Sequence, residues 1–350
     1  MMVEPQSMCW LSGRLAERRD ASTWLEELRP LPQLKDLLSD AGVGLCKAAK
    51  TLAAERPALR HTLDVFHLKR EGNKALRRDY SAASQAMEEA AAKQAEADKL
   101  RRRGRHSSNQ STAARHRWKR AEALLDQAAA SERAWREVGT ALELFTPDGR
   151  LNDRRQAEAK IQEALPHLQG RGWAKTRRLL KRAETLTFLD RLQERVPALG
   201  FSKETLTALE RLEGLERQPE RSQGESPNAG AARGLALIST VQLAQSDPQW
   251  QEKLAQFRQV LQNTRRASSC VEGVNSVVRM QQARHRRMTQ GLLDLKRLYW
   301  NMRPFRTGRR KNRSPYEILG VNLPTNSWWD LLELPIDVLQ QRLSAPKDGE

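Results

Sequence analysis

Two acidic residues have the setting that metal-dependent chemistry on phosphate groups requires. Asp40 follows the leucine-rich segment 34–39 and precedes a Gly-containing turn. Glu272 opens a helical segment within residues 265–313, which contain fourteen Lys and Arg but only two acids. An isolated carboxylate on a cationic surface suits a protein that binds phosphate and holds a divalent metal against it. We therefore predict that Asp40 and Glu272 come together at one site.

Each of these acids also has a structural interpretation. Asp is a favoured N-cap residue, so Asp40 suits the start of the helix that follows it. Ser269 and Glu272 fit the Ser-x-x-Glu capping box, in which Glu reaches back to a backbone amide. On a helix, however, Glu272 shares one face with Asn275 and Arg279, while three valines share the other. That polar face is reasonable for a metal and phosphate site, and both interpretations stay open.

A second pair of polar residues, Asp64 and His67, ends a strand-like segment beside two basic residues. Sets of Asp, Glu and His bind transition metals, but Mg²⁺ prefers oxygen ligands and retains water. We therefore expect Asp64 and His67 to support the site by orienting neighbouring groups, rather than to ligate the metal directly.

The composition points to a polyanionic partner. The 350 residues include 61 Lys and Arg against 43 Asp and Glu, a formal net charge of +18. So large a basic excess indicates nucleic acid first and an anionic membrane surface second. The alternative is a solvated, Arg-rich surface that binds no polyanion.

Cysteine usage and hydropathy indicate a soluble protein of a reducing cytoplasm. The three cysteines are far apart and form no Cys-x-x-Cys pair, so neither a zinc site nor a disulfide framework is supported. No run approaches the roughly 18 apolar residues of a membrane span. The N-terminus also lacks the basic flank and apolar core of a signal peptide.

Residues 1–67 have the alternating pattern of an α/β segment. Strands are predicted at Ser7–Leu11, Leu34–Ser39 and His61–Phe66, and helices at Ala21–Leu28 and Gly42–Glu55. Asp40 then lies at the carboxyl end of a buried strand, where open α/β sheets place their ligands.

Residues 68–265 are predicted to be almost entirely helical. A long antiparallel hairpin is expected over residues 68–145, because apolar residues of its second half recur at three- and four-residue spacings. These are Trp118, Ala121, Leu125, Ala128, Trp135, Val138, Leu142 and Phe145. The same spacing also suits a dimer along this segment. We interpret the Trp residues as a packed seam rather than as base-stacking groups. Further helices are predicted at Leu151–Leu165, Gly172–Leu186, Lys203–Glu216 and Leu235–Asn263, the last with a break before Pro248.

Residues 266–350 combine helices with a basic loop. An amphipathic helix is predicted over Met288–Met302, followed by the exposed basic loop Phe305–Arg313. Pro315 is expected to start a short helix that ends at Leu319. Two more helices are predicted near Trp328–Leu332 and Ile336–Leu343.

Several of these segments resemble DDE-type insertion-sequence transposases. The likeness rests on Leu38-Ser39-Asp40-Ala41-Gly42-Val43-Gly44-Leu45, on Leu63 to Arg70, and on Ser268 to Ser276. The tail segments Asn301 to Arg306 and Arg313 to Gly320 are similar to the same group. The likeness covers the two ends of the chain, whereas the roughly 200 residues between them match only in being helical.

The resemblance implies an RNase H-like core that is interrupted by a helical insertion before the last acid. Asp40 would match the second acid of the catalytic triad and Glu272 the third, both holding Mg²⁺ in a two-metal site for DNA strand cleavage and transfer. Asp64 and His67 would match an accessory Asp-x-x-His signature. The implied partners are transposon ends and target DNA, in a prokaryotic cytoplasm near the nucleoid. The residues expected to neutralise DNA phosphates are Arg279, Arg284, Arg286, Arg287, Arg303, Arg306, Arg309, Arg310, Lys311 and Arg313.

The sequence departs from that family in one respect. The family's first aspartate lies on the first core strand, and we find no counterpart, since Asp20 sits in a polar turn. The resemblance therefore suggests the C-terminal portion of a transposase, which we expect to cut DNA poorly or not at all.

The overall expectation is a mixed α/β fold that is mostly helical. Residues 1–67 and 266–350 would form a partial RNase H-like core, and residues 68–265 a large all-α insertion. The alternative function is a non-enzymatic, helical nucleic-acid-binding protein whose long hairpin is the working element.

Overall fold

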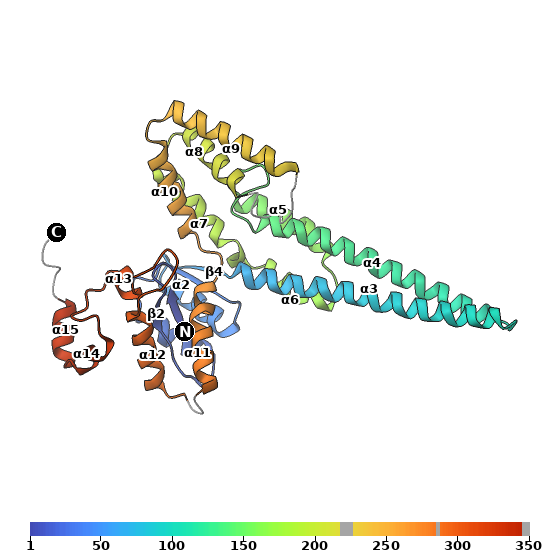
Figure 1. The fold of residues 1–350 in the computed structure, drawn as a ribbon, viewed down its shortest axis with the longest axis horizontal. Coiled ribbons are helices and arrows are strands. Elements are labelled where there is room, and N and C mark those ends of the chain that lie inside the picture. The colour runs from blue at the N-terminus through green and yellow to red at the C-terminus, as the bar shows by residue number, and fades with distance from the viewer. Residues whose placement is uncertain (218–226, 285–287, 345–350) are drawn as a thin grey trace. The chain divides into compact units, whose positions relative to one another are not determined.

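The computed structural model describes residues 1–217, 227–284 and 288–344 and is mostly helical (Figure 1). Helices account for 68% of it, together with two small two-stranded sheets. The chain divides into two compact units. Unit 1 contains residues 1–34, 42–57 and 268–350, and unit 2 contains residues 35–41 and 58–267.

Unit 1 is built on an antiparallel hairpin of β1 (Met2–Glu4) and β2 (Cys9–Ser12). The helices α11 (Ser269–Arg284) and α12 (Gln290–Met302) supply Val274, Val278 and Leu293 to a core that includes Trp10 of β2. A strand this short buries little surface by itself, so these helices stabilise the hairpin.

The buried amide of Asn301 fixes α12 to β2. Its Oδ1 accepts a hydrogen bond from the Trp10 backbone N–H at 2.8 Å, and its Nδ2 donates to the Trp10 carbonyl at 3.0 Å. The amide thereby satisfies both backbone groups of a strand residue that has no further strand beside it at this point.

Two helices, α1 (Ala21–Leu28) and α2 (Val43–Glu55), pack together in unit 1, and Leu28 and Leu52 on them are fully buried. Asp20 caps α1, accepting hydrogen bonds from the N–H and Oγ1 of Thr23. Three short helices end the described chain: α13 (Pro315–Leu319), α14 (Trp328–Glu333) and α15 (Ile336–Ser344).

Unit 2 begins with a parallel pair of strands, β3 (Asp36–Ser39) and β4 (Arg60–Leu63). The prediction of one partial RNase H-like sheet in residues 1–67 was wrong for the described chain. The four strands form two separate pairs, of which β1–β2 belongs to unit 1 and β3–β4 to unit 2. Each strand has only three or four residues, and its partner is set by contacts that local sequence does not encode.

The predicted long hairpin consists of α3 (Val65–Arg102) and α4 (Ser108–Ala141), which run side by side in Figure 1. Its seam is made mainly of alanines at seven-residue spacing. Ala83, Ala90 and Ala97 on α3 are buried, as are Ala114, Ala121 and Ala128 on α4. Small residues at the contact let the two backbones approach closely. The intramolecular hairpin thus accounts for the periodicity.

The tryptophan residues of α4 have different environments. Trp135 is buried against Gly72, and its indole N–H donates to Asn73 Oδ1 at 2.8 Å. Trp118 and Leu125, which we predicted to be in the seam, are instead 36% and 38% exposed. They flank the alanine seam, because a close contact between helices leaves no room for larger side chains.

The rest of unit 2 is a series of shorter helices. They are α5 (Arg154–Ala164), α6 (Ala174–Leu180), α7 (Thr187–Arg195), α8 (Lys203–Glu216), α9 (Pro227–Ser246) and α10 (Trp250–Asn263). Four 3-10 turns lie between them, at Leu165–His167, Arg171–Trp173, Ala183–Thr185 and Pro197–Leu199.

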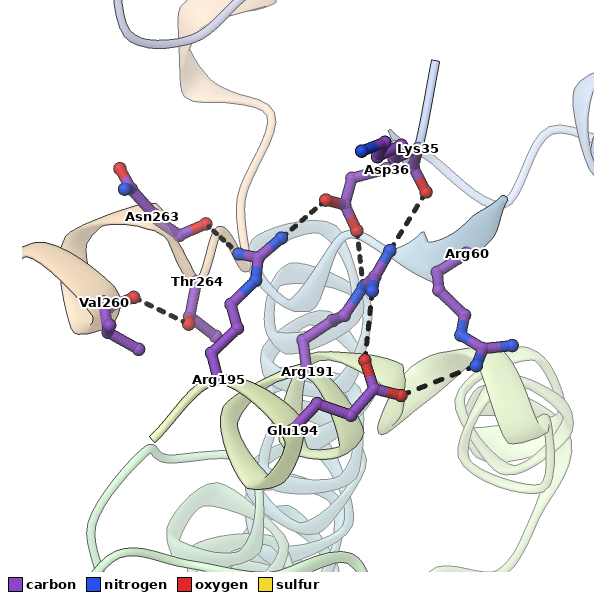
Figure 2. A network of polar contacts seen from close by, with 9 residues as sticks. All are labelled: Lys35, Asp36, Arg60, Arg191, Glu194, Arg195, Val260, Asn263 and Thr264. Carbon is purple, nitrogen blue, oxygen red and sulfur yellow. Dashed lines mark hydrogen bonds and ion pairs between the residues drawn. The ribbon is translucent and has the colours of Figure 1, made fainter. Parts of the chain in front are cut away.

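Two arginines attach α7 to the parallel strands, as Figure 2 shows. Arg191 Nε donates to Asp36 Oδ1 at 2.7 Å, and Arg195 Nη2 donates to Asp36 Oδ2 at 2.7 Å. Arg195 also donates to the carbonyl of Asn263 at 3.2 Å, which brings in the end of α10. One carboxylate at the start of β3 thus connects three segments that are far apart in sequence.

Candidate functional site

Asp40 lies directly after β3, and its side chain is exposed. The N-cap of α2 is Gly42, and no side chain makes the capping hydrogen bond there. Helix α2 therefore does not use Asp40 as its N-cap residue. The acid lies at the carboxyl end of the strand, where we expected it.

Asp64 lies at the same end of the parallel pair, because Ser39 is paired with Leu63. Its backbone N–H donates to the Ser39 carbonyl at 2.8 Å. Unlike Asp40, the Asp64 side chain is almost fully buried and caps α3, with Oδ1 accepting from the His67 N–H at 3.0 Å. The strand that we predicted through Phe66 therefore ends at Leu63, since the cap starts a helix at Val65.

The same carboxylate holds the imidazole of His67. Asp64 Oδ2 lies 2.9 Å from His67 Nδ1. The Asp-x-x-His spacing thus combines a helix cap with a close contact between carboxylate and imidazole. Whether these two residues serve a metal site stays a prediction.

Ser39 and His61 form a buried polar pair that the sequence analysis missed. Ser39 Oγ lies 2.8 Å from His61 Nε2 across the β3–β4 pair. Burial lowers the pKa of His61, and Arg182 adds to this effect while Glu184 opposes it. The imidazole is therefore held neutral near pH 7. The pairing depends on strand register, so no local sequence signal identifies it.

Glu272 lies on the exposed face of α11, opposite the buried Val274 and Val278. The carbonyl of Ser268 accepts the first helical hydrogen bonds, from the N–H groups of Val271 and Glu272. Ser268 is thus the N-cap by its backbone, one residue before the position that the predicted capping box requires. The helix register therefore does not support the capping-box interpretation of Glu272.

The polar face of α11 is as predicted near its start. Arg279 is exposed and Asn275 is half-buried. Ser276 Oγ donates to the Gly273 carbonyl at 2.8 Å, so that hydroxyl is engaged within the helix. The polar groups on this face thus include a carboxylate, an amide and a guanidinium.

Asp40 belongs to unit 2 and Glu272 to unit 1. Each unit is described by itself, so the meeting of the two acids stays a prediction. Within the described residues, no group of three or more His, Cys, Asp or Glu side chains could hold a metal ion. Two exposed carboxylates nevertheless fit Mg²⁺, which binds through one or two carboxylates and keeps several waters.

The basic loop after α12 is an ordered turn with exposed charges. Phe305 and Arg313 are joined by a backbone hydrogen bond of 3.1 Å, and Gly308 has a φ of 79°. The exposed predicted contacts of this loop are Arg303, Arg306, Arg309, Lys311 and Arg313.

Arg310 differs from its neighbours in this loop. Its Nε donates to the Gln6 carbonyl at 2.7 Å, its Nη2 donates to the Pro5 carbonyl at 2.9 Å, and the guanidinium lies over the Phe305 ring. We therefore assign Arg310 to fixing the loop. The predicted contacts Arg286 and Arg287 lie outside the described residues, as does the side chain of Arg284.

A half-buried ionic cluster in unit 2 was also missed. Glu143 accepts from Lys69 Nζ at 2.6 Å and from Arg266 Nη1 at 2.8 Å. Burial alone would raise the pKa of Glu143, but the two cations more than offset it and the pKa is lowered. The cluster joins α3 to the segment that precedes α11, so its role is structural.

No protein-family model, curated protein or solved structure matches this chain. Among the described helices, none has the length and apolar character needed to cross a bilayer.

Proposed function

We propose that this chain acts on DNA as part of a DDE-type transposase, with Asp40 and Glu272 as the carboxylates that hold Mg²⁺. The observation that carries the proposal is that both acids are exposed. Asp40 follows a strand of a parallel pair, and Glu272 lies on a helix whose other face is buried.

The corresponding domain proposal is that residues 1–67 and 266–350 act together as one core, which the helical residues 68–265 interrupt. Its support is the order of elements along the chain. The strand that ends before Asp40 comes first, the long helices follow, and the helix that carries Glu272 comes last.

The chemistry divides between the acids and the basic side chains. When bound, Mg²⁺ supplies Lewis-acid stabilisation of the charge that builds on phosphate oxygens. Asp40 and Glu272 hold it, and Asn275 lies one turn from Glu272 to orient a neighbouring group. Arg279 and the exposed cations of the basic loop neutralise DNA phosphates, which positions DNA without reading its sequence. Because the proposed set contains two acids rather than three, we expect weak strand cleavage by this chain alone.

DNA binding with and without divalent ions tests the proposal. Anisotropy of a labelled duplex should show tighter binding in Mg²⁺ than in EDTA at matched ionic strength. Asp40→Asn and Glu272→Gln should each remove that difference, while Asp126→Asn, an exposed acid on α4, should keep it. Equal Mg²⁺ stimulation in all four proteins would contradict the proposal.

Metal-dependent nicking of plasmid DNA separates the incomplete site from an active one. We expect little nicking by the wild-type chain. Strong nicking that Glu272→Gln abolishes would support the role of Glu272 and contradict the expected incompleteness.

The alternative, a non-enzymatic nucleic-acid-binding protein, is favoured by the long, regular α3–α4 hairpin. It predicts that Asp40→Asn and Glu272→Gln leave DNA binding unchanged under every ionic condition. It also predicts that removal of residues 81–145 abolishes binding.

A further inference from the structure

The end of the α3–α4 hairpin carries a concentration of positive charge that the proposed site does not use. Residues 99–120, which we call the hairpin end, contain nine Lys and Arg and no Asp or Glu. They comprise the last turn of α3, the connecting loop and the first turns of α4. Half of the chain's net charge of +18 therefore lies in 22 residues.

The remainder of the hairpin has no such excess. Residues 65–98 of α3 contain six basic and six acidic residues, and residues 121–141 of α4 contain two basic and four acidic ones. Opposite charges on these parts can pair along each helix, as Lys93 does with Glu96 at 2.6 Å and Arg136 with Glu132 at 3.5 Å. The excess is thus local to the hairpin end.

Most cations of the hairpin end are exposed and have no acidic neighbour. In this part of the described chain, Arg117 pairs with Glu89 and Arg101 lies 3.4 Å from Asp98. No carboxylate of the described residues lies within 4.0 Å of the other seven basic groups, Lys99, Arg102, Arg103, Arg105, Arg115, Lys119 and Arg120, all of which are exposed. Their mutual repulsion opposes folding unless an anion binds.

Helix-dipole compensation explains only part of this pattern. Lys99, Arg101 and Arg102 lie in the last turn of α3, where cations interact favourably with the negative end of the helix. The groups at Arg115 and Lys119 lie in the N-terminal half of α4, where the dipole gives them no such benefit. A structural role therefore leaves the basic residues of α4 unexplained.

The alanine seam makes the hairpin a narrow and continuous support for these charges. It reaches close to the end of both helices, with Ala97 and Ala114 fully buried. At a rise of about 1.5 Å per residue, the 38 residues of α3 span about 57 Å. The cations are thus carried far from the root of the hairpin on a well-packed pair of helices.

We propose that the hairpin end is a second DNA-binding surface, which contacts the phosphate backbone of duplex DNA. Duplex DNA carries about one negative charge per 1.7 Å of its axis, which matches a dense group of exposed guanidinium and ammonium groups. An anionic membrane is a poorer fit, because binding there also requires an apolar face. The only large apolar side chains of the hairpin end are Leu100 and Trp118.

This surface is independent of the proposed metal site. The hairpin end belongs to unit 2, whereas Glu272 and the basic loop after α12 belong to unit 1. A result that refutes the strand-transfer proposal therefore does not refute this inference, and the reverse also holds.

The test is a salt titration of DNA binding by the full chain, using anisotropy of a labelled duplex of arbitrary sequence. The tip variant replaces Arg102, Arg103 and Arg105 with Gln. If all three side chains contact phosphates, the slope of log K against log salt falls by about 2.7. We expect at least about a tenfold rise in Kd near 0.1 M salt.

The matched control replaces Arg70, Lys74 and Arg77 with Gln, which removes the same charge from an exposed part of α3. We expect this control to change Kd less than about threefold, since it lies where charges are balanced. Equal effects of the two variants would mean that only net charge matters and would overturn the inference.

Two further measurements complete the test. A variant with Arg306, Arg309 and Arg313 replaced by Gln examines the basic loop of the proposed function. If it binds DNA normally while the tip variant does not, the hairpin end stands and the proposed role of the loop fails. Binding of wild-type chain to phosphatidylserine vesicles, lost in the tip variant while duplex binding is kept, would overturn the inference in favour of a membrane.

Discussion

Gly72 on α3 allows the ring of Trp135 on α4 to lie against the helix backbone. A Cβ atom added at Gly72 would lie 2.0 Å from Trp135 Cζ2 and 2.2 Å from its Cη2. These are atoms of a buried ring, and the indole N–H is held by Asn73 Oδ1 at 2.8 Å. Gly72→Ala must therefore displace the ring, the backbone or both.

The magnitude follows from three opposing terms. Replacing Gly by Ala inside a helix gains about 1 kcal/mol of intrinsic helix propensity. Loss of the indole hydrogen bond costs about 1 kcal/mol, which cancels that gain. Overpacking of a core costs about 1–3 kcal/mol, and this term remains. We expect Gly72→Ala to lower the free energy of unfolding by about 1–3 kcal/mol.

Gly139 on α4 provides the matched control, because nothing lies within 4 Å of a Cβ built there. Gly139→Ala should raise stability by up to about 1 kcal/mol. The assay is urea unfolding followed by circular dichroism at 222 nm.

The same substitution in a chain that lacks the Trp135 ring separates the steric clash from the other effects. Gly72→Ala should cost less in a Trp135→Leu chain, where the large ring is absent. The reasoning is refuted if Gly72→Ala is as stable as the wild type, or if its cost is the same with and without the indole.

Three other perturbations test the packing of the two units by the same urea assay. Burial lowers the pKa of His61 from its usual value of about 6.5, so the unfolded chain binds more protons below that pH. The free energy of unfolding should therefore fall as pH drops below about 6.5. His61→Asn should reduce this pH dependence of stability. The control His116→Asn, at an exposed position, should leave it unchanged. Glu143→Gln removes the charge partner of two half-buried cations and should cost about 1.5–3 kcal/mol, and a cost below about 1 kcal/mol would contradict the cluster's role. Asn301→Ala removes the hydrogen-bond partner of the Trp10 backbone N–H and carbonyl, so it should lower the free energy of unfolding by about 2–4 kcal/mol. An unchanged stability would show that those two groups find other partners.

Elements with strong local signals were predicted to the residue. The helices over 21–28, 203–216 and 315–319 have the bounds expected from sequence. The last of these begins with a capping box between Ser314 and Glu317 and ends at Gly320 with a φ of 79°. Such signals lie within a few residues of the helix end, which is why sequence alone identifies them.

Elements fixed by distant partners were not predicted. The helix α7 was missed, and its attachment depends on Arg191 and Arg195 reaching Asp36, more than 150 residues away in sequence. Strand pairing failed for the same reason, since a strand of three or four residues has no preferred partner by composition.

The candidate site stays a prediction. Asp40 and Glu272 were singled out because isolated acids beside turns or within basic runs are visible in sequence, and both are exposed. The use of Arg310 to fix the loop was not visible, because it depends on the carbonyl groups of Pro5 and Gln6, which folding brings near. The use of Asp64 as a helix cap has a local partner, the His67 N–H, but the strand predicted through Phe66 hid it.

The most direct test of the central claim is Mn²⁺ binding, followed by the electron paramagnetic resonance signal of the free ion. If Asp40 and Glu272 hold the same metal, Asp40→Asn and Glu272→Gln should each weaken binding strongly, and the double variant should lose little more than either single one. Asp126→Asn should bind as the wild type does. Unchanged binding in both single variants, or losses that simply add in the double variant, would contradict a shared site.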